Sequence, residues 1–191
     1  MPAINRKSVW GESRIMEERN ELIKDEIDII QNNKFFKFGT DSVLLANFVE
    51  SKSSDIIVDF GSGSGVIPLL LAFKKDCKKI VGIEIQPELV NLAMKNIKMN
   101  DFEEKIEIIE GDFSNSRKYI EPNIFDIVIS NPPYLKTDTG QISENKFKAI
   151  ARHEIKADLE DVIREAALAL KNGGKFYLVY RSNRMEEVFH L

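Results

Sequence analysis

The sequence is poor in cysteine, with Cys77 as its single thiol among 191 residues. One cysteine excludes an intramolecular disulfide and a zinc site built from several cysteines, and it is typical of a reducing compartment. No apolar run approaches the roughly 20 residues that a membrane-spanning helix needs. The first 14 residues also lack the apolar core of a signal peptide. We therefore expect a cytoplasmic protein with no membrane span and no metal site.

Basic residues do not dominate either, since 27 Lys and Arg stand against 31 Asp and Glu, for a net charge of -4. An acidic balance argues against nonspecific coating of nucleic acid, although it leaves room for a local basic patch. Hydrophobic residues make up 43% of the chain and charged residues 30%, a globular composition. We expect a polar arm at residues 1–25, loose or helical, and one domain at 26–191.

What the sequence does contain is a regular alternation of short apolar runs and helical segments from residue 55 onward. Strands are expected at 56–60, 79–85, 105–109, 125–129 and 175–180, and the main helices between them at 66–75, 87–99 and 158–170. Such alternation predicts a doubly wound α/β fold, a mostly parallel sheet with helices on both faces.

Both ends of this pattern carry further expectations. Upstream, β-prone runs at 28–31 and 35–38 flank two adjacent asparagines, which predicts a hairpin. Thr40 is then expected to cap a helix at 41–50. Downstream, the strand at 175–180 is expected at or near a sheet edge, followed by a last helix at 183–191 capped by Ser182. An apolar edge strand favours aggregation, so we expect the chain to be part of a longer protein.

A glycine-rich loop, Asp59-Phe60-Gly61-Ser62-Gly63-Ser64-Gly65, follows the first strand of the alternation and precedes a helix. Glycine permits a tight turn and a close approach of a ligand to the backbone. Glu84 ends the next strand, where a carboxylate can accept both hydroxyls of a ribose. Strand, loop, helix, strand and acid at this spacing predict a nucleoside-containing cofactor.

The kind of cofactor follows from how the loop departs from known fingerprints. The third glycine of the dinucleotide motif comes one position early, and the P-loop motif is absent. Asp59 would repel a pyrophosphate but suits a cationic, phosphate-free nucleoside, which points to S-adenosylmethionine. After the third strand, Asp112 can accept from an adenine amine while Phe113 packs on the ring. The alternative for this pair is a helix-start aspartate with a core phenylalanine.

The most informative stretch is Asn131-Pro132-Pro133-Tyr134, directly after the fourth strand. The prolines stiffen the loop. The Asn131 side-chain oxygen and the Pro132 carbonyl can then accept from one planar amine, orient its nitrogen and favour the charge that it gains on attack. Tyr134 offers a face on which a planar base or amide can stack. The alternative without a catalytic role is a turn that the two prolines make rigid.

These residues resemble the class I S-adenosylmethionine-dependent methyltransferases that methylate amines, and most closely the bacterial tRNA (adenine-N6) methyltransferases acting on valine tRNA. The resemblance runs from Asp28 through the stretch 36–45, the glycine loop and the Asn-Pro-Pro-Tyr motif to Ala151-Arg152-His153-Glu154. It departs at the C-terminus, because members carry two further strands that this chain lacks.

The resemblance implies roles for particular residues. Those expected to bind the cofactor are Phe38, Thr40, Asp41, Asp59, Gly61, Gly63, Glu84, Ile85, Asp112, Phe113 and Asn131. Asn131, Pro132, Pro133 and Tyr134 are expected to hold the target base, so the expected partner is tRNA. A net positive segment at 135–156 is a candidate contact for its phosphates, with a solvated loop as the alternative.

Other functions share much of this logic. A glutamine amide of a peptide release factor is also a planar –NH₂, although those enzymes carry a helical N-terminal domain that is not visible here. Guanine-N2 methylation of ribosomal RNA and adenine methylation of DNA are further alternatives. A cofactor-binding scaffold without catalysis is the non-enzyme alternative, and the complete Asn131–Tyr134 motif counts against it.

Overall fold

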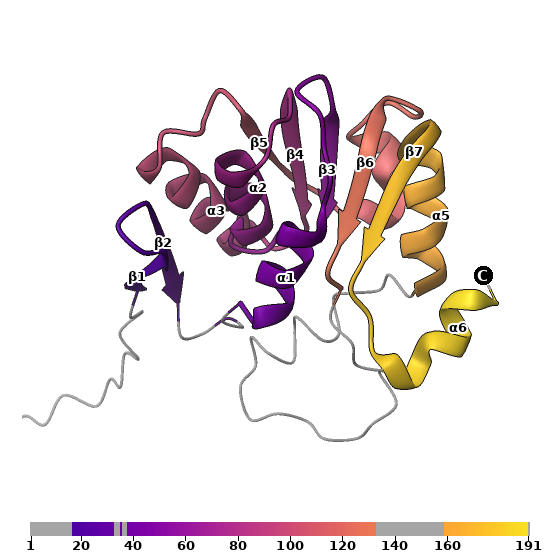
Figure 1. Ribbon diagram of the computed structural model, residues 1–191, viewed down its shortest axis with the longest axis horizontal. Coiled ribbons are helices and arrows are strands. Elements are labelled where there is room, and N and C mark those ends of the chain that lie inside the picture. The colour runs from indigo at the N-terminus through magenta and orange to yellow at the C-terminus, as the bar shows by residue number, and fades with distance from the viewer. Residues whose placement is uncertain (1–16, 33–34, 36–37, 133–158, 191) are drawn as a thin grey trace, which may run out of the picture.

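The computed structural model describes residues 17–32, 35, 38–132 and 159–190. A five-stranded sheet forms its centre, with strands β3 (Ile56–Phe60), β4 (Lys79–Glu84), β5 (Ile106–Glu110), β6 (Phe125–Ser130) and β7 (Leu170–Leu178). All neighbours pair parallel in the order β5-β4-β3-β6-β7. The chain thus winds outward in both directions from β3, which confirms the expected doubly wound α/β fold (Figure 1).

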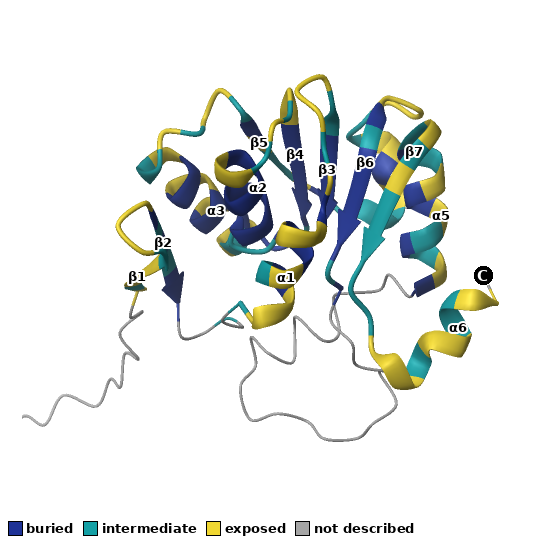
Figure 2. Ribbon diagram, in the orientation of Figure 1, coloured by how far each residue is buried: buried dark blue, intermediate teal, exposed yellow. Residues whose placement is uncertain are grey.

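Helices cover both faces of the sheet because its central strands are apolar on both sides. On one face, buried residues of α1 (Thr40–Phe48), α2 (Val66–Lys74) and α3 (Pro87–Met99) pack on Ile57, Ile80 and Ile127. On the other face, α5 (Leu159–Ala169) packs Ala166 and Ala169 on Val58 and Val128. The core therefore lies in two layers, with β3, β4 and β6 between them (Figure 2).

The expected element boundaries are close to the observed ones. The helix at 87–99 and the strand at 56–60 agree with α3 and β3, and the other strands and helices from α2 to α5 begin and end within one residue of the expectation. The last strand is the exception, since β7 begins at Leu170, opposite Phe125, and passes through an irregular stretch that holds Gly173 before the expected start at Lys175.

The N-terminal hairpin differs from the expectation. Strand β2 (Ile27–Asn32) pairs antiparallel with β1 (Glu17–Ile23), which lies before it, and the expected partner at 35–38 lies partly outside the described residues. The turn lies at residues 24–26, where Asp25 adopts a left-handed φ of 59° that aspartate tolerates. Charge-dense β1 has little strand propensity of its own, so pairing with β2 decides its conformation. The expected polar arm at 1–25 therefore ends in a strand.

Two expected caps are also corrected. Thr40 is the first residue of α1, and Gly39 occupies the N-cap position in an extended conformation, without a side-chain hydrogen bond. At the other end, a 3-10 turn, η2 (Ser182–Arg184), precedes α6 (Met185–Phe189), so this helix begins at Met185 and Ser182 does not cap it. Within the described part of the chain, β7 is an edge strand as expected, and none of its residues is fully buried.

The helices of the described residues are short, and α3 spans 13 residues. None of these helices is both long and apolar enough to cross a membrane. Across the same ranges of the chain, no group of three or more His, Cys, Asp or Glu side chains is placed to hold a metal ion.

Candidate functional site

The carboxyl ends of the parallel strands meet at one edge of the sheet, where ligands bind in doubly wound folds. This is the lower edge in Figure 1, beside the start of α1. Because β5, β4, β3 and β6 are neighbours in that order, the residues that follow them come together although they lie up to 70 positions apart in the sequence. The candidate site is therefore built from four loops and the first turn of α1.

The glycine loop leaves β3 and crosses over the end of β4. The backbone N–H groups of Gly61 and Ser62 both donate to the Ile83 carbonyl, at 2.9 and 3.2 Å. Gly61, Gly63 and Gly65 have left-handed φ angles of 76°, 56° and 84°, which glycine adopts without a steric penalty. Three left-handed residues in five give the loop its tight course, and they explain why the sequence places glycine at alternate positions.

Glu84 holds the middle of this loop from the end of β4. Its carboxylate accepts from the Gly63 N–H at 2.8 Å and from the Gln86 N–H at 3.0 Å. Burial raises the pKa of Glu84, and the two backbone donors oppose that shift. Each carboxylate oxygen keeps a second lone pair, so the side chain can brace the loop and still accept from a ligand. Ile85, expected beside it, is half-buried.

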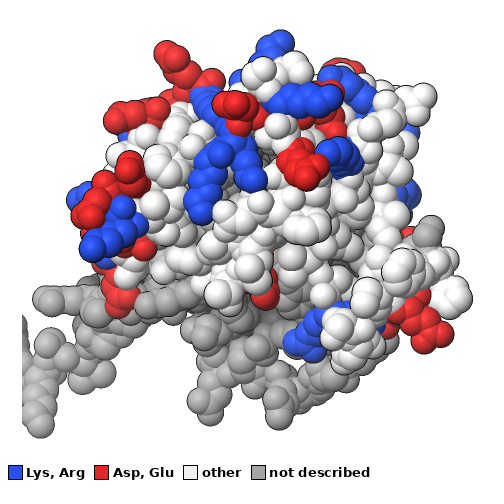
Figure 3. Space-filling model, viewed as in Figure 1, with Lys and Arg blue, Asp and Glu red and all other residues white. Residues whose placement is uncertain are grey.

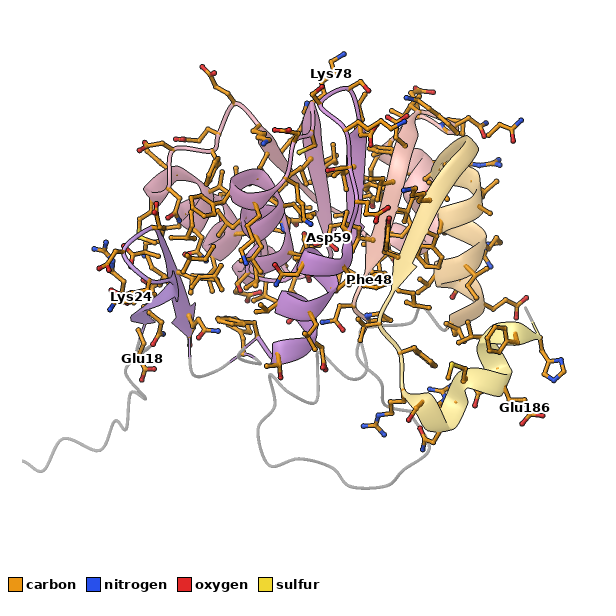
Figure 4. The ribbon with its side chains drawn as sticks, viewed as in Figure 1. Glu18, Lys24, Phe48, Asp59, Lys78 and Glu186 are labelled. Carbon is orange, nitrogen blue, oxygen red and sulfur yellow. The ribbon has the colours of Figure 1, made fainter. Side chains whose placement is uncertain are left out.

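Asp59 is a buried ionisable group without a hydrogen-bond partner in the described part of the chain. The side chain is fully buried, and neither carboxylate oxygen has a hydrogen-bond partner there (Figure 4). Burial, helped by the negative charge of Glu84, raises the pKa of Asp59 to about 8. A buried carboxylate without donors is costly to the folded state. Buried ionisable groups with a shifted pKa that destabilise the folded state in this way are typical of functional sites.

Asp112 and Phe113 follow β5 and reach the same edge. Phe113 stacks on Phe60 at the end of β3, with ring centroids 5.3 Å apart and planes 4° from parallel. Asp112 caps the short helix η1 (Phe113–Lys118) by accepting from the Ser114 N–H at 2.9 Å. One oxygen of Asp112 therefore caps a helix, as the alternative interpretation expected. The contact of Asp112 with an adenine amine stays a prediction.

Asn131, at the end of β6, is held by a residue that sequence reasoning did not single out. Its side-chain Nδ2 donates to the Ser42 hydroxyl in the first turn of α1, at 2.9 Å. Ser42 lies within the stretch 36–45 that carries the family resemblance, but no role was expected of it. This contact joins the start of α1, with the exposed Thr40 and Asp41, to the candidate catalytic loop.

The remaining expected residues are only partly placed. Pro132 is buried directly after Asn131, and Phe38 is half-buried against the α1 side of the core. Pro133, Tyr134 and the segment 135–156 lie outside the described residues. Ser62 was also missed, although it lies inside the glycine loop; among the described residues its buried hydroxyl lacks a hydrogen-bond partner. The structure thus brings together the loop residues after β3, β4, β5 and β6.

A doubly wound sheet with a glycine loop after its first strand, an acid ending the second and Asn131-Pro132 after the fourth is the architecture of the class I methyltransferase fold. Comparison with known proteins agrees, since residues 33–189 match the methyltransferase small domain family. The chain therefore belongs to the methyltransferase small domain family.

Curated relatives confirm the expected resemblance to the bacterial tRNA (adenine-N6) methyltransferases. The tRNA1(Val) (adenine(37)-N6)-methyltransferase of Porphyromonas gingivalis is 30% identical over 169 residues, covering 85% of this chain and 66% of the relative. The enzyme of the same name from Tolumonas auensis is 30% identical over 167 residues, covering 87% and 68%. The chain spans about two thirds of the length of these relatives.

Solved structures support the fold. TYW2 of P. horikoshii, in complex with MeSAdo, superposes with a TM-score of 0.62 at 19% identity, covering 95% of this chain and 59% of that protein. The geranyl diphosphate C-methyltransferase of Streptomyces coelicolor gives a TM-score of 0.56 at 12% identity, covering 74% and 44%. At these identities the likeness concerns the fold alone.

Proposed function

We propose that this chain transfers a methyl group from S-adenosylmethionine to the exocyclic amine of an adenine in tRNA. The observation that carries the proposal is the convergence of Asn131 and the glycine loop on one edge of the sheet, with Asn131 anchored to Ser42. The names of the relatives support the choice of tRNA, and such a substrate fits the cytoplasmic compartment expected from the single cysteine.

The residues present fit the proposed cofactor. Asp59 and Glu84 place two buried carboxylates under the loop, and the two oxygens of Asp59 lack donors among the described residues. This pair of acidic side chains suits the cationic methionine end of S-adenosylmethionine, which carries no phosphate. Glu84 remains available to the ribose and Phe113 to the adenine. When bound, S-adenosylmethionine supplies an electrophilic methyl group to an amine that afterwards loses one proton.

The protein's own contribution is orientation. An Asn131 amide that donates its –NH₂ to Ser42 turns its oxygen to the opposite side, and an amide oxygen has two lone pairs. That oxygen and the Pro132 carbonyl are proposed to accept from the target amine, which aligns the nitrogen and stabilises the positive charge that it gains. The base must leave its stack to reach them, which is easiest in a single-stranded loop.

The decisive experiment is methyl transfer from labelled S-adenosylmethionine, with unmodified total tRNA, release-factor protein, ribosomal RNA and duplex DNA offered in parallel. Labelled RNA is then digested to nucleosides. We expect N6-methyladenosine in tRNA. Label in protein would move the assignment to glutamine methylation, and N2-methylguanosine in ribosomal RNA would move it to guanine methylation.

Substitution of Asn131 separates catalysis from cofactor binding. We expect Asn131→Ala to lower kcat by at least about a hundredfold, because it removes a positioned acceptor that acts in the transition state. The Kd for S-adenosylhomocysteine, measured by calorimetry, should change less than about threefold. Lys118→Ala, an exposed change on η1, is the control. A loss of cofactor affinity as large as the loss of rate would contradict this division of roles.

A further inference from the structure

Asn96 on α3 joins three segments that are distant in the sequence. The side chain is fully buried, and its Oδ1 accepts from the Ile30 N–H of β2 at 2.7 Å. Its Nδ2 donates one hydrogen to the Ile30 carbonyl at 3.1 Å and the other to the Ser64 carbonyl at 3.0 Å. Both amide hydrogens are therefore used, one on the hairpin and one on the glycine loop.

The end of the glycine loop rests on α3 at a second point as well. Gly65 packs so closely on the helix that a Cβ placed on it would lie 3.2 Å from the Cβ of Ala93. Ala93 and Asn96 are three residues apart, and hence on the same face of α3. The start of the loop is held by Ile83 and its middle by Glu84, while its end is held by the Gly65 N–H, which donates to the Ser62 carbonyl, and by α3.

Asn100, the C-cap residue of α3 and four positions after Asn96, makes matching contacts with β2 without reaching the loop. Its Oδ1 accepts from the Asp28 N–H at 3.1 Å, and its Nδ2 donates to the Asp28 carbonyl at 2.8 Å and to the Asn96 carbonyl at 2.7 Å. Asn96 and Asn100 thus bond alternate residues of β2, as a neighbouring strand would. Asn96 is fully buried within α3 and Asn100 is half-buried at its C-cap, and of the two only Asn96 contacts Ser64.

We propose that Asn96 is a positioning residue for the cofactor, acting through the Ser64 carbonyl. This inference rests on the proposed binding of S-adenosylmethionine by the loop. Without the amide, the Ser64 carbonyl loses its donor, and the peptide between Ser64 and the left-handed Gly65 keeps one of its two hydrogen bonds, from the Gly65 N–H to the Ser62 carbonyl at 2.9 Å. The loop then samples conformations that do not bind, and ordering it weakens the apparent affinity.

The hairpin has the complementary role of keeping Asn96 in place. Its exposed surface carries both charge signs, with ion pairs between Arg19 and Asp28 and between Glu17 and Lys95 of α3 (Figure 3). Exposed pairs of this kind contribute little to stability. The two asparagines therefore supply side-chain hydrogen bonds that attach β2 to α3, beside the apolar burial of Ile29, and the hairpin in turn fixes the amide that faces the loop.

The test compares Asn96→Ala with Asn100→Ala in the full chain. Both remove a side chain with three hydrogen bonds, so both should lower Tm by several degrees. We expect Asn96→Ala to raise the Kd for S-adenosylhomocysteine about tenfold or more, by calorimetry, and Asn100→Ala to change it less than about threefold. A purely structural role would shift Tm without separating the two affinities.

The binding experiment with the two variants distinguishes failure of this inference from failure of the proposed function. A wild-type chain that does not bind S-adenosylhomocysteine contradicts the proposed function itself. A wild-type chain that binds, with equal affinities in the two variants, overturns the role of Asn96 alone. Asn96→Ser places a shorter polar group, a hydroxyl, in the buried position and serves where Asn96→Ala does not fold. It should also bind S-adenosylhomocysteine more weakly than Asn100→Ala, and equal binding overturns the inference.

Discussion

Asp59 shows at the scale of one residue how stability and function oppose each other. Its carboxylate is fully buried beside Glu84, and burial raises its pKa to about 8. A hydrophobic residue on β3 would pack there without this cost, as Ile57 does two positions earlier on the same face. The proposed reason for an acid is the cationic cofactor, whose positive charge would favour the ionised form.

The raised pKa of Asp59 predicts a pH dependence of stability in the absence of ligand. Below about pH 4 the group is protonated in the folded and the unfolded chain. As pH rises toward 8, the unfolded chain releases a proton that the folded chain retains, so stability falls by up to about 1.4 kcal/mol per pH unit. Above the folded pKa the contribution becomes constant. Urea unfolding at pH 5, 6.5 and 8 measures this slope.

Asp59→Asn should flatten that profile, although the raised pKa of Glu84 acts in the same direction and leaves part of the slope. The variant should therefore be more stable than the wild type at pH 8 and closer to it at pH 5. It should also bind S-adenosylhomocysteine more weakly. Glu104→Gln, an exposed change before β5, is the matched control. Parallel profiles for Asp59→Asn and the wild type would contradict the assignment.

At the scale of elements, the glycine loop depends on the helix beneath it. Gly65 and Gly173 have nearly the same left-handed φ, 84° and 81°. Only Gly65 lies against a neighbour, Ala93, whereas a Cβ on Gly173 would meet nothing within 4 Å. A side chain at either position would carry the same free-energy cost of a left-handed backbone. The two positions differ in the space that is available for a Cβ atom.

Substitution by alanine separates these two effects. Gly173→Ala should cost about 1 kcal/mol for a left-handed alanine, and Gly65→Ala about 1–3 kcal/mol more, because the added methyl group crowds α3. Gly65→Ala should also weaken the binding of S-adenosylhomocysteine, and Gly173→Ala should not. Urea unfolding and calorimetry measure both quantities. Equal losses of stability would show that the contact with Ala93 is readily relieved.

For the whole molecule, ligand binding should appear as thermal stabilisation, because the site is assembled from loops of four strands and exists only in the folded chain. At a ligand concentration of one hundred times Kd, mass action adds about 2.7 kcal/mol. For a chain of this size, that raises Tm by about 5–10 °C. S-adenosylhomocysteine should produce this shift in a melting experiment.

NAD serves as the control ligand, because the glycine loop departs from the dinucleotide fingerprint. We expect no shift with NAD at the same concentration. A shift in Tm with NAD equal to that with S-adenosylhomocysteine would show that the site recognises adenosine in general. Asp59 and Glu84 would then not select the cofactor.

The order of strands and helices from residue 56 onward could be predicted from local sequence patterns, as could the loops that form the candidate site. These features are local: apolar runs of strand length, amphipathic helices and glycines at turns carry their signal within about ten residues. The candidate roles of Asp59, Gly61, Glu84 and Asn131 followed from their places at strand ends, because parallel strands bring those ends to one edge.

Contacts between segments that are distant in the sequence could not be predicted and are visible only in the folded chain. Charge-dense β1 pairs with β2 although its own residues favour no strand. Ser42 meets Asn131 across 89 positions, and Asn96 meets Ile30 across 66. Serine and asparagine are common in ordinary surface positions, so their types alone carry no functional signal. Only the fold, by burying these polar groups together, obliges each to find a partner and so gives it a role.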